Sequence, residues 1–496
     1  MSRRGLPELA KHSAVYAFGN FLQRAIGFFL IPVYTRFLAP SDYGVLEILN
    51  VTLEVILIFC HFGAGTGLMR TLLYEADSQE EQKIAFATAF WFVALLSGMV
   101  LSIACVFSPG ISRLAAGSPA FAPWFRLIFV AGLLQLNASI VLRVYRAELR
   151  SVAFTAIQLA SFVTGLVLNT FFLAVLNTGL RGVLISGIIS SAVLFAGSVI
   201  FLRDHFRLAF SPRHLRSMLR FGAPFIPTFL TMWILTGADR YFLQHFASST
   251  EVGLYSLGMR FALILQFAFR TPLEQNWPAI YYPLAKQPGG SRELGRIVAY
   301  IFAAGAFLAL AIGLFSGPAI RIMATPAFYP SYRVVPLLVA AVFLNVLNLC
   351  ASVGVNVSGR SEFTSLVTMP AAALNLLLDW WMVPRYGMMG AAAATAISFG
   401  VMVVAHFLIS QRFYRVEYDW GKIARALLAL ATPVVIRVSM PTPGLIYEVA
   451  LDVGLCLLFL AILFASGFVG PDASRWLQQG ARQSARRILV GLGHRA

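Results

Sequence analysis

Fourteen apolar stretches follow one another from Ser13 to Phe468, each close to the ~20 residues that a helix needs to cross a bilayer. They begin near residues 13, 44, 84, 120, 151, 180, 218, 252, 294, 332, 363, 387, 420 and 444. Backbone amides in hydrocarbon must bond within their own segment, so these stretches predict helices, and the short alternating strands of a membrane barrel are not visible. The pattern predicts an all-α integral membrane protein with about fourteen transmembrane helices.

Two landmarks recur at nearly one interval, which indicates an internal duplication. Gly44 and Gly253 lie 209 positions apart in similar segments, and Gly182 and Gly390 lie 208 apart. The interval predicts two six-helix lobes, over residues 1–210 and 211–415, followed by two extra helices in 416–470 and a basic cytoplasmic tail in 471–496. Six is an even number, so both lobes enter the membrane from the same side, as a parallel repeat. Duplicated membrane halves are typical of transporters.

The charged residues agree with this topology. Hydrophobic residues make up 59% of the chain and charged residues 12%, whereas about 25% is usual in soluble domains. With a cytoplasmic N-terminus, 26 Lys and Arg residues fall inside and 9 outside, as the positive-inside rule requires. Both termini are then cytoplasmic. The net charge of +17 is explained by topology and by attraction to anionic membrane lipids, so no nucleic-acid partner is expected.

The first stretch contains three polar residues, Asn20, Gln23 and Arg24. Asn20 and Arg24 share one helix face because they are four residues apart. A charged residue at a helix centre costs about 3 kcal/mol even on lenient insertion scales, so it usually faces a wet cavity or a partner. We expect these residues to bind substrate; the alternative for Arg24 is a structural pair with a carboxylate.

The second stretch carries a polar stripe of Glu47, Asn50, Glu54 and His61, spaced so that all four share one helix face. Such a stripe faces protein or water. We expect Glu54, the deeper carboxylate, to balance the charge of Arg24 or to carry a coupling ion, H⁺ or Na⁺. Glu47 has the same two possible roles or lies in a helix interface. His61 is expected to cap or pack.

The corresponding stretch of the second lobe carries Arg260, Gln266, Arg270 and Glu274. The last three follow at intervals of four and therefore share one helix face. We expect Arg260, the deepest of them, and Gln266 to line a substrate cavity. Arg270 either joins them or extends its side chain to the inner membrane surface.

Three arginines at the end of the fourth stretch, Arg143, Arg146 and Arg150, are predicted to lie on one helix face. They fit a cytoplasmic mouth that attracts a diphosphate. They also fit the ordinary basic flank of a membrane helix.

Other polar residues are expected to have structural roles. Asp239 and Arg240 should form an ion pair, and Asp379 should lie with two tryptophans in an aromatic belt at the membrane interface. Five asparagines are expected to make hydrogen bonds between helices. They are Asn137, Asn169, Asn345, Asn348 and Asn375.

The sequence contains no P-loop, no histidine cluster with metal-ligand spacing and no nucleophile motif. Its four cysteines are far apart in apolar stretches and are expected to pack as small apolar residues. We therefore expect no metal, no cofactor and no enzymatic activity. An ion gradient or the membrane potential is expected to drive transport.

Several motifs together resemble those of a known family. They are QRAIG at 23–27, RFLAPSDYG at 36–44, DRYFL at 239–243, VGLY at 252–255 and YGMMG at 386–390. In their order and spacing, over essentially the whole chain, the sequence resembles bacterial polysaccharide flippases of the multidrug/oligosaccharidyl-lipid/polysaccharide (MOP) exporter superfamily.

The resemblance implies two six-helix lobes arranged as a V around a central cavity. It implies transport of an undecaprenyl-diphosphate-linked oligosaccharide, a repeat unit of O-antigen or exopolysaccharide, across the bacterial inner membrane. Polysaccharide polymerase or assembly proteins would be partners. Arg24 matches a first-helix arginine of the related peptidoglycan-precursor flippases.

Two other functions stay open at this point. A cation-coupled multidrug exporter of the same superfamily should have a cavity dominated by carboxylates, because its substrates are cationic. A membrane polysaccharide polymerase or ligase generally needs a sizeable outward loop for its acceptor, and the outward segments here are short.

Overall fold

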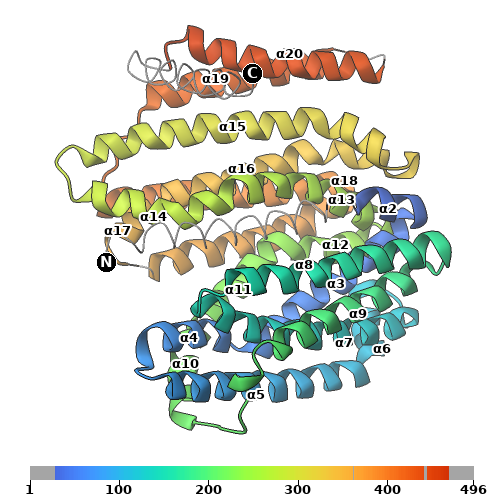
Figure 1. Ribbon diagram of the computed structural model, residues 1–496. Helices are drawn as coiled ribbons and strands as arrows, with labels where there is room; N and C mark the ends of the chain where they lie inside the picture. Colours follow the sequence, from blue (N-terminus) through green and yellow to red (C-terminus); the bar gives the residue numbers. More distant parts are fainter. Residues whose placement is uncertain (1–27, 29, 361, 441–443, 469–496) are drawn as a thin grey trace, which may run out of the picture.

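The computed structural model describes residues 28, 30–360, 362–440 and 444–468, and every regular element in these ranges is a helix (Figure 1). The α-helices before residue 210 are α2 (Ile31–Phe37), α3 (Pro40–His61), α4 (Ala64–Arg70), α5 (Gln79–Val106), α6 (Ser108–Ala116), α7 (Ala122–Ala147), α8 (Ser151–Thr170) and α9 (Gly179–Ile200). Those after it are α10 (Pro212–Gly222), α11 (Ile226–Trp233), α12 (Asp239–Phe246), α13 (Ser249–Leu265), α14 (Thr271–Ala285), α15 (Gly290–Met323), α16 (Val335–Ala351), α17 (Val353–Val357), α18 (Glu362–Phe413), α19 (Trp420–Ser439) and α20 (Leu445–Ala465).

Within the described ranges, 11 helical segments are long and apolar enough to cross a membrane, which confirms the all-α membrane class. The stretches predicted near residues 363 and 387 are both contained in α18, which is bent at Gly387, where φ is 54° and ψ is −134°. The stretch near residue 218 is divided among α10, α11 and α12. The stretch near residue 13 lies outside the described residues, and α19 is not among the 11. The total of fourteen therefore stays a prediction.

Most of the long helices run roughly side by side across the view (Figure 1). Those before residue 210, blue to green, gather in the lower part of the view, and α15, α16 and α18, yellow to orange, lie above them. The pair α19 and α20 packs against α15 and forms the outermost layer. The core is made by apolar side chains buried between these helices.

The first helical turns of α3 and α13 lie in backbone contact. A Cβ atom on Gly44 would lie 1.8 Å from the carbonyl oxygen of Ser249, and one on Gly253 would lie 2.0 Å from that of Pro40. The contact is reciprocal, since each glycine meets the residue four positions before the other. Only glycine permits this approach of two backbones.

The second pair of landmarks is also alike in local structure. Gly179 and Gly387 have positive φ angles of 58° and 54°. Three residues later, Gly182 and Gly390 each pack against the chain that precedes the turn; a Cβ atom would lie 2.6 Å from Phe172 and 2.5 Å from the carbonyl oxygen of Met382. A left-handed residue and a close approach both favour glycine, which explains why the sequence pattern recurs here.

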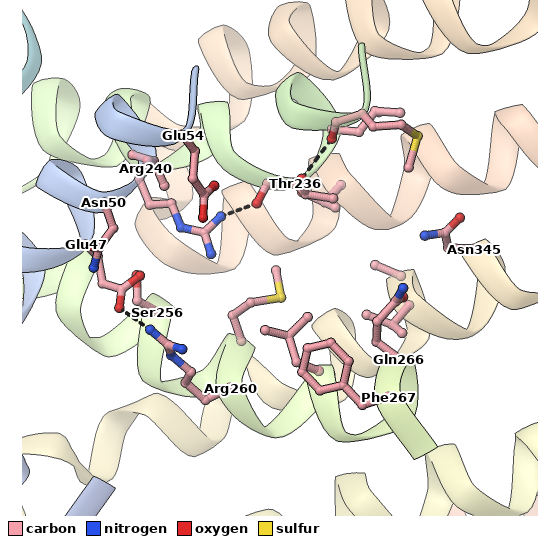
Figure 2. Close-up of a pocket in the computed structure, with 18 of the residues that line it drawn as sticks. Glu47, Asn50, Glu54, Thr236, Arg240, Ser256, Arg260, Gln266, Phe267 and Asn345 are labelled. Carbon is pink, nitrogen blue, oxygen red and sulfur yellow. Dashed lines mark hydrogen bonds and ion pairs between the residues drawn. The ribbon is translucent and has the colours of Figure 1, made fainter. Parts of the chain in front are cut away.

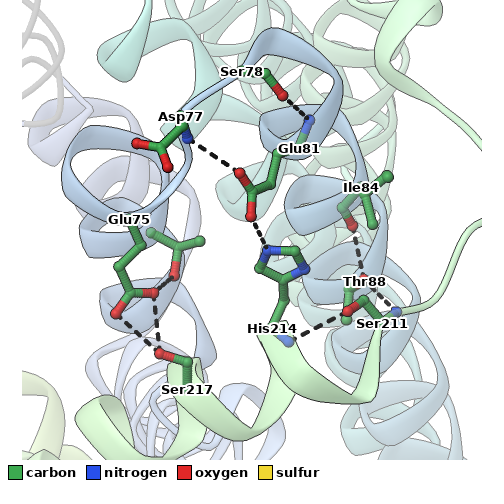
Figure 3. A network of polar contacts seen from close by, with 10 residues as sticks. Glu75, Asp77, Ser78, Glu81, Ile84, Thr88, Ser211, His214 and Ser217 are labelled. Carbon is green, nitrogen blue, oxygen red and sulfur yellow. Dashed lines mark hydrogen bonds and ion pairs between the residues drawn. The ribbon is translucent and has the colours of Figure 1, made fainter.

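The segment that joins the two halves is fixed to the first half by α10 (Figure 3). His214 Nε2 lies 3.2 Å from Glu81 Oε1, and Ser217 Oγ donates to the Glu75 carboxylate at 3.0 Å. Below these polar contacts Met218 is fully buried against α4, where Gly67 leaves room for the Met218 backbone. The basic residues Arg213, Arg216 and Arg220 are exposed.

A buried ionic cluster joins α15 to the helices α19 and α20. Glu448, 2% exposed, accepts from both Arg321 and Arg437, and Arg437 Nε donates to Asp452 at 2.9 Å. The two carboxylates are buried and the two arginines are partly exposed, and together the four groups carry no net charge.

Replacement of Glu448 by glutamine should destabilise the protein. The change leaves Arg321 and Arg437 without their shared partner, and breaking a buried pair costs about 3–5 kcal/mol. We expect the Tm of the detergent-purified protein to fall by several degrees. The control Glu362→Gln changes an exposed carboxylate at the start of α18 and should leave the Tm within error. Equal Tm values for Glu448→Gln and the control would show that the cluster does not hold α20 in place.

Candidate functional site

A cavity of about 610 Å³ lies between α3 and α7, from the first half, and α11, α12, α13, α16 and α18, from the second (Figure 2). This volume is within the ~300–1,000 Å³ usual for ligand sites. Leucine, methionine and phenylalanine side chains form much of the wall. The polar lining residues are Glu47, Asn50, Glu54, Gln135, Thr236, Arg240, Ser256, Arg260, Gln266, Arg270, Asn345 and Thr395.

An ion pair crosses from one half to the other at the edge of this cavity. Arg260 Nη2, on α13, lies 2.7 Å from Glu47 Oε1, on α3, and Figure 2 shows the two side chains extended toward each other. The Glu47 side chain is 8% exposed, whereas that of Arg260 is 46% exposed. Tyr43 also acts electrostatically on Arg260. Glu47 is thus held at the interface, and the guanidinium keeps donors free to face the cavity.

A second arginine is more deeply set. Arg240, on α12, donates to Asp239 Oδ1 at 2.9 Å and to the carbonyl oxygen of Thr236, and its guanidinium lies 5.4 Å from the ring centre of Tyr255. The ion pair predicted for Asp239 and Arg240 is confirmed. The prediction missed that Arg240 also lines the cavity.

Glu54 lies on the wall contributed by α3, one helical turn beyond Asn50. It is exposed to the cavity, and no described residue forms an ion pair with it. Among the described residues, Arg240 and Arg260 are the cations whose charges act on its carboxylate, Arg240 more strongly, and Figure 2 shows Arg240 beside Glu54. The two carboxylates therefore differ in environment. Glu47 already forms an ion pair, whereas Glu54 forms none with a described residue and can bind a ligand or an ion.

The third arginine of the cavity wall, Arg270, lies at a point where the helix type changes. Residues Gln266–Arg270 form a π-helical turn between α13 and α14, and such turns are frequent at functional sites. Gln266 and Arg270 both line the cavity. Arg270 Nη1 also pairs with Glu274 Oε2 at 2.8 Å, a contact that the sequence analysis did not predict.

The three arginines at the end of α7 do not line this cavity. Arg143 packs against Gly65 of α4, and the Arg146 guanidinium lies 4.8 Å from the ring centre of Phe154. The prediction of one helix face is wrong for Arg150. The helix ends at Ala147, and Arg150 precedes α8 and pairs with Glu148 at 2.6 Å.

The predicted residues of the first stretch, Asn20, Gln23 and Arg24, lie outside the described residues.

His61 does cap and pack, as expected: its Nδ1 accepts from the Gly63 amide at 3.1 Å, and its ring packs edge-on against Phe229.

Polar atoms without partners gather behind the cavity, between α12 and α18. Asp379 is 0% exposed, and neither of its carboxylate oxygens has a hydrogen-bond partner among the described residues. The same holds for both amide atoms of Asn375, one helical turn away. Asp379 acts electrostatically on Asp239, whose second oxygen accepts from the Tyr255 hydroxyl.

This placement corrects the prediction for Asp379. Trp380 and Trp381 are exposed, as an interfacial belt requires, but Asp379 points inward because successive helix positions are about 100° apart.

Of the five asparagines, Asn137 and Asn348 make the predicted bonds between helices, to Ser97 and His406. Neither amide atom of Asn375 has a partner among the described residues, and Asn169 bonds within its own helix.

The apolar helices and the charged cavity between them define a multi-pass membrane protein with an internal cavity. The chain belongs to the family described as polysaccharide biosynthesis proteins, whose model matches residues 33–281. This family, together with the flippase relatives, confirms the predicted resemblance to polysaccharide flippases of the MOP superfamily.

Among its relatives is the probable low-salt glycan biosynthesis flippase Agl15 of Haloferax volcanii, 20% identical over 98% of this chain and 99% of that protein. The fold is similar to lipid II flippase MurJ in an inward closed conformation, with a TM-score of 0.69 and 13% identity over 91% of this chain and 99% of MurJ. It is also similar to an inward-facing multidrug resistance MATE family transporter, with a TM-score of 0.64 and 14% identity over 78% and 94% of the two chains.

Proposed function

We propose that this protein moves an undecaprenyl-diphosphate-linked oligosaccharide from the inner to the outer leaflet of the bacterial inner membrane by alternating access. The observation that carries the proposal is the exposed guanidinium of Arg260 in the cavity wall. Arg240, Arg260 and Arg270 line the cavity, and each also pairs with a carboxylate, Asp239, Glu47 and Glu274 respectively. Because the Arg260 side chain is 46% exposed, its guanidinium can still donate to an anionic ligand.

The diphosphate would bind at Arg260, whose planar guanidinium can donate two parallel hydrogen bonds to phosphate oxygens. Gln266 and Arg270 would contact it from the next turn of the same wall. Arg24, with Asn20 and Gln23, would add a further cation from the first helix. Arg143, Arg146 and Arg150 would act earlier, as the cytoplasmic mouth that attracts the substrate.

Alternating access needs two bodies that move against each other. We assign residues 1–210 and 211–415 to two six-helix lobes of a parallel repeat, arranged as a V, with 416–470 as two extra helices and 471–496 as a cytoplasmic tail. The reciprocal contact of Gly44 and Gly253 supports this assignment, since equivalent residues meet each other across a two-fold axis. Both termini would be cytoplasmic, and polymerase or assembly proteins would take over the product outside.

The multidrug exporter remains the second candidate, favoured by the MATE-like fold and by the available carboxylate of Glu54. The two candidates make opposite predictions for a cationic dye. An exporter of cations should move it out of vesicles, whereas the proposed flippase should not, because the arginines repel it.

Coupling to an ion would involve the buried cluster behind the cavity. Asp379, Asn375 and Asp239 offer only oxygen and amide groups, and hard cations prefer oxygen ligands. A buried polar group without a partner calls for an explanation, and transient binding of Na⁺ or H⁺ supplies one. Glu54, exposed in the cavity, is the alternative carrier and would otherwise balance the arginine charge.

Replacement of Asp379 by asparagine should uncouple transport from the gradient. The change keeps the shape of the side chain and removes its charge. In vesicles we expect the stimulation of flipping by an imposed Na⁺ or pH gradient to disappear, while Glu362→Gln, the exposed control, keeps it. If Glu54→Gln abolishes the stimulation and Asp379→Asn does not, the carrier is Glu54 and the assignment to Asp379 is wrong.

A further inference from the structure

A second compartment opens from the cavity into the first half of the protein. It has a volume of about 340 Å³ and lies among α3, α7, α8 and α9. Glu47, Asn50, Gln135 and Arg260 line both spaces, so the two compartments meet at the ion pair. A ligand held by Arg260 would therefore have access to each.

The lining of this compartment differs from that of the cavity in charge. Apart from Glu47 and Arg260 at the shared boundary, none of its described lining residues is charged. Serine side chains of α8 and α9 face it instead, and Phe162 and Leu166 supply an apolar wall. Among the described residues a phosphate would find no cation deeper in this space, whereas an uncharged ligand with hydroxyl groups would find partners.

One side chain is set for such a ligand. Asn169 is 7% exposed and lines the compartment. Its amide nitrogen donates to the Gly165 carbonyl oxygen at 2.7 Å, which fixes the side chain, and its Oδ1 has no partner among the described residues. A buried amide oxygen without a partner is a strong acceptor that awaits a donor.

The neighbouring hydroxyls are also acceptors. Ser161 Oγ donates to the Ser190 carbonyl oxygen at 2.7 Å, and Ser190 Oγ donates to that of Gly187 at 3.1 Å. Because their hydrogens are already used, these oxygens offer lone pairs to an incoming O–H or N–H group. Asn50 and Gln135, at the boundary, carry amide groups that can donate in return.

From this arrangement we propose that the compartment binds a neutral sugar residue next to the diphosphate of the substrate. Sugar hydroxyl or acetamido groups would donate to Asn169 Oδ1 and to the serine oxygens, and the sugar's apolar face would rest on Phe162. The proposal rests on the flippase function given above and adds that the half before residue 210 selects the sugar while the arginines hold the phosphates.

Two variants should impair sugar binding in the compartment by different means. Asn169→Leu deletes the acceptor. Gly187→Leu fills the space, since no atom lies within 4 Å of a Cβ at this position, and it introduces a better helix former. Thr170→Leu is the matched control, because Thr170 is the exposed neighbour of Asn169 on α8 and does not line the compartment.

The experiment measures binding of two probes to the full-length protein in nanodiscs, polyprenyl diphosphate and the same lipid bearing one N-acetylglucosamine. We expect the wild type and Thr170→Leu to bind the sugar-bearing probe about tenfold more tightly, equivalent to ~1.4 kcal/mol. Asn169→Leu and Gly187→Leu should lose this advantage and bind the sugar-free probe as the wild type does.

Two outcomes would overturn the sugar compartment alone: equal affinity of the wild type for both probes, or variants that keep the wild-type preference. An equal loss of both probes in a variant that elutes as a folded protein would also overturn it, because Asn169 would then not be selective for sugar. If the wild type binds neither probe, the flippase function itself fails, and the sugar compartment fails with it.

Discussion

Arg260→Ala is expected to reduce flipping of a lipid-linked oligosaccharide by about 100-fold or more. Two charge-assisted hydrogen bonds to phosphate are lost, each worth about 1.5–3 kcal/mol. Arg260→Lys should recover only part of the activity, because an ammonium group cannot make the bidentate contact. Arg292→Ala, an exposed residue of α15 outside the cavity, serves as the control and should retain wild-type activity.

The loss of Arg260 also leaves the buried Glu47 without its partner, so stability has to be separated from binding. The double variant Arg260→Ala with Glu47→Gln removes both charges and should restore the amount of folded protein. We expect this variant to be stable and still inactive. Recovery of flipping in the double variant would mean that Arg260 acts as a structural partner of Glu47 and does not bind the substrate.

Gly44→Val and Gly253→Val should each nearly abolish transport. Added Cβ atoms would lie 1.8 Å and 2.0 Å from backbone oxygens, and a backbone cannot move aside as a flexible side chain can. Overpacking in a core costs about 1–3 kcal/mol even where side chains can adjust, so a larger cost is expected here. The first turns of α3 and α13 would be forced apart, which removes the point where the two halves meet.

Because the contact is reciprocal, the two valine variants should have similar effects on flipping and on Tm. Gly98→Val is the matched control, since this glycine of α5 has no atom within 4 Å of a Cβ position. It should keep transport and Tm near the wild-type values, because the space is open and valine is a somewhat better helix former than glycine. Transport-competent valine variants would show that α3 and α13 need not touch during the cycle.

The sequence predicted those features that depend on local composition or on glycine. The apolar stretches identified the helices, because hydrocarbon imposes internal hydrogen bonding on any backbone that crosses it. The interval between Gly44 and Gly253 could be found because no other residue fits a backbone contact of this kind. The recurrence at Gly182 and Gly390 has a similar cause, since Gly179 and Gly387, three residues before them, have positive φ angles in the structure.

Features that depend on distant partners were not predictable. Glu47 pairs with a residue 213 positions away, so the sequence could not show that Glu47, and not Glu54, would be the paired carboxylate. Arg240 was predicted only as a structural cation because its neighbour Asp239 supplied an obvious partner, while its position on the cavity wall follows from packing against α3.

Two errors came from helix geometry. A helix face was extended past Ala147, so Arg150 was placed with Arg143 although it belongs to the next helix. Asp379 was grouped with the tryptophans beside it, although a neighbouring position on a helix points in a different direction. The π-helical turn at Gln266–Arg270 had no sequence signal, since its residues also fit an ordinary helix.

The most direct test of the proposed function is reconstitution of the purified protein in proteoliposomes with a fluorescent undecaprenyl-diphosphate-linked oligosaccharide. A membrane-impermeant reagent that modifies the sugar reports the fraction in the outer leaflet over time. We predict that wild-type protein moves the lipid between leaflets, that Arg260→Ala does not, and that a cationic dye is left in place. Movement of the dye with no movement of the lipid-linked oligosaccharide would contradict the account.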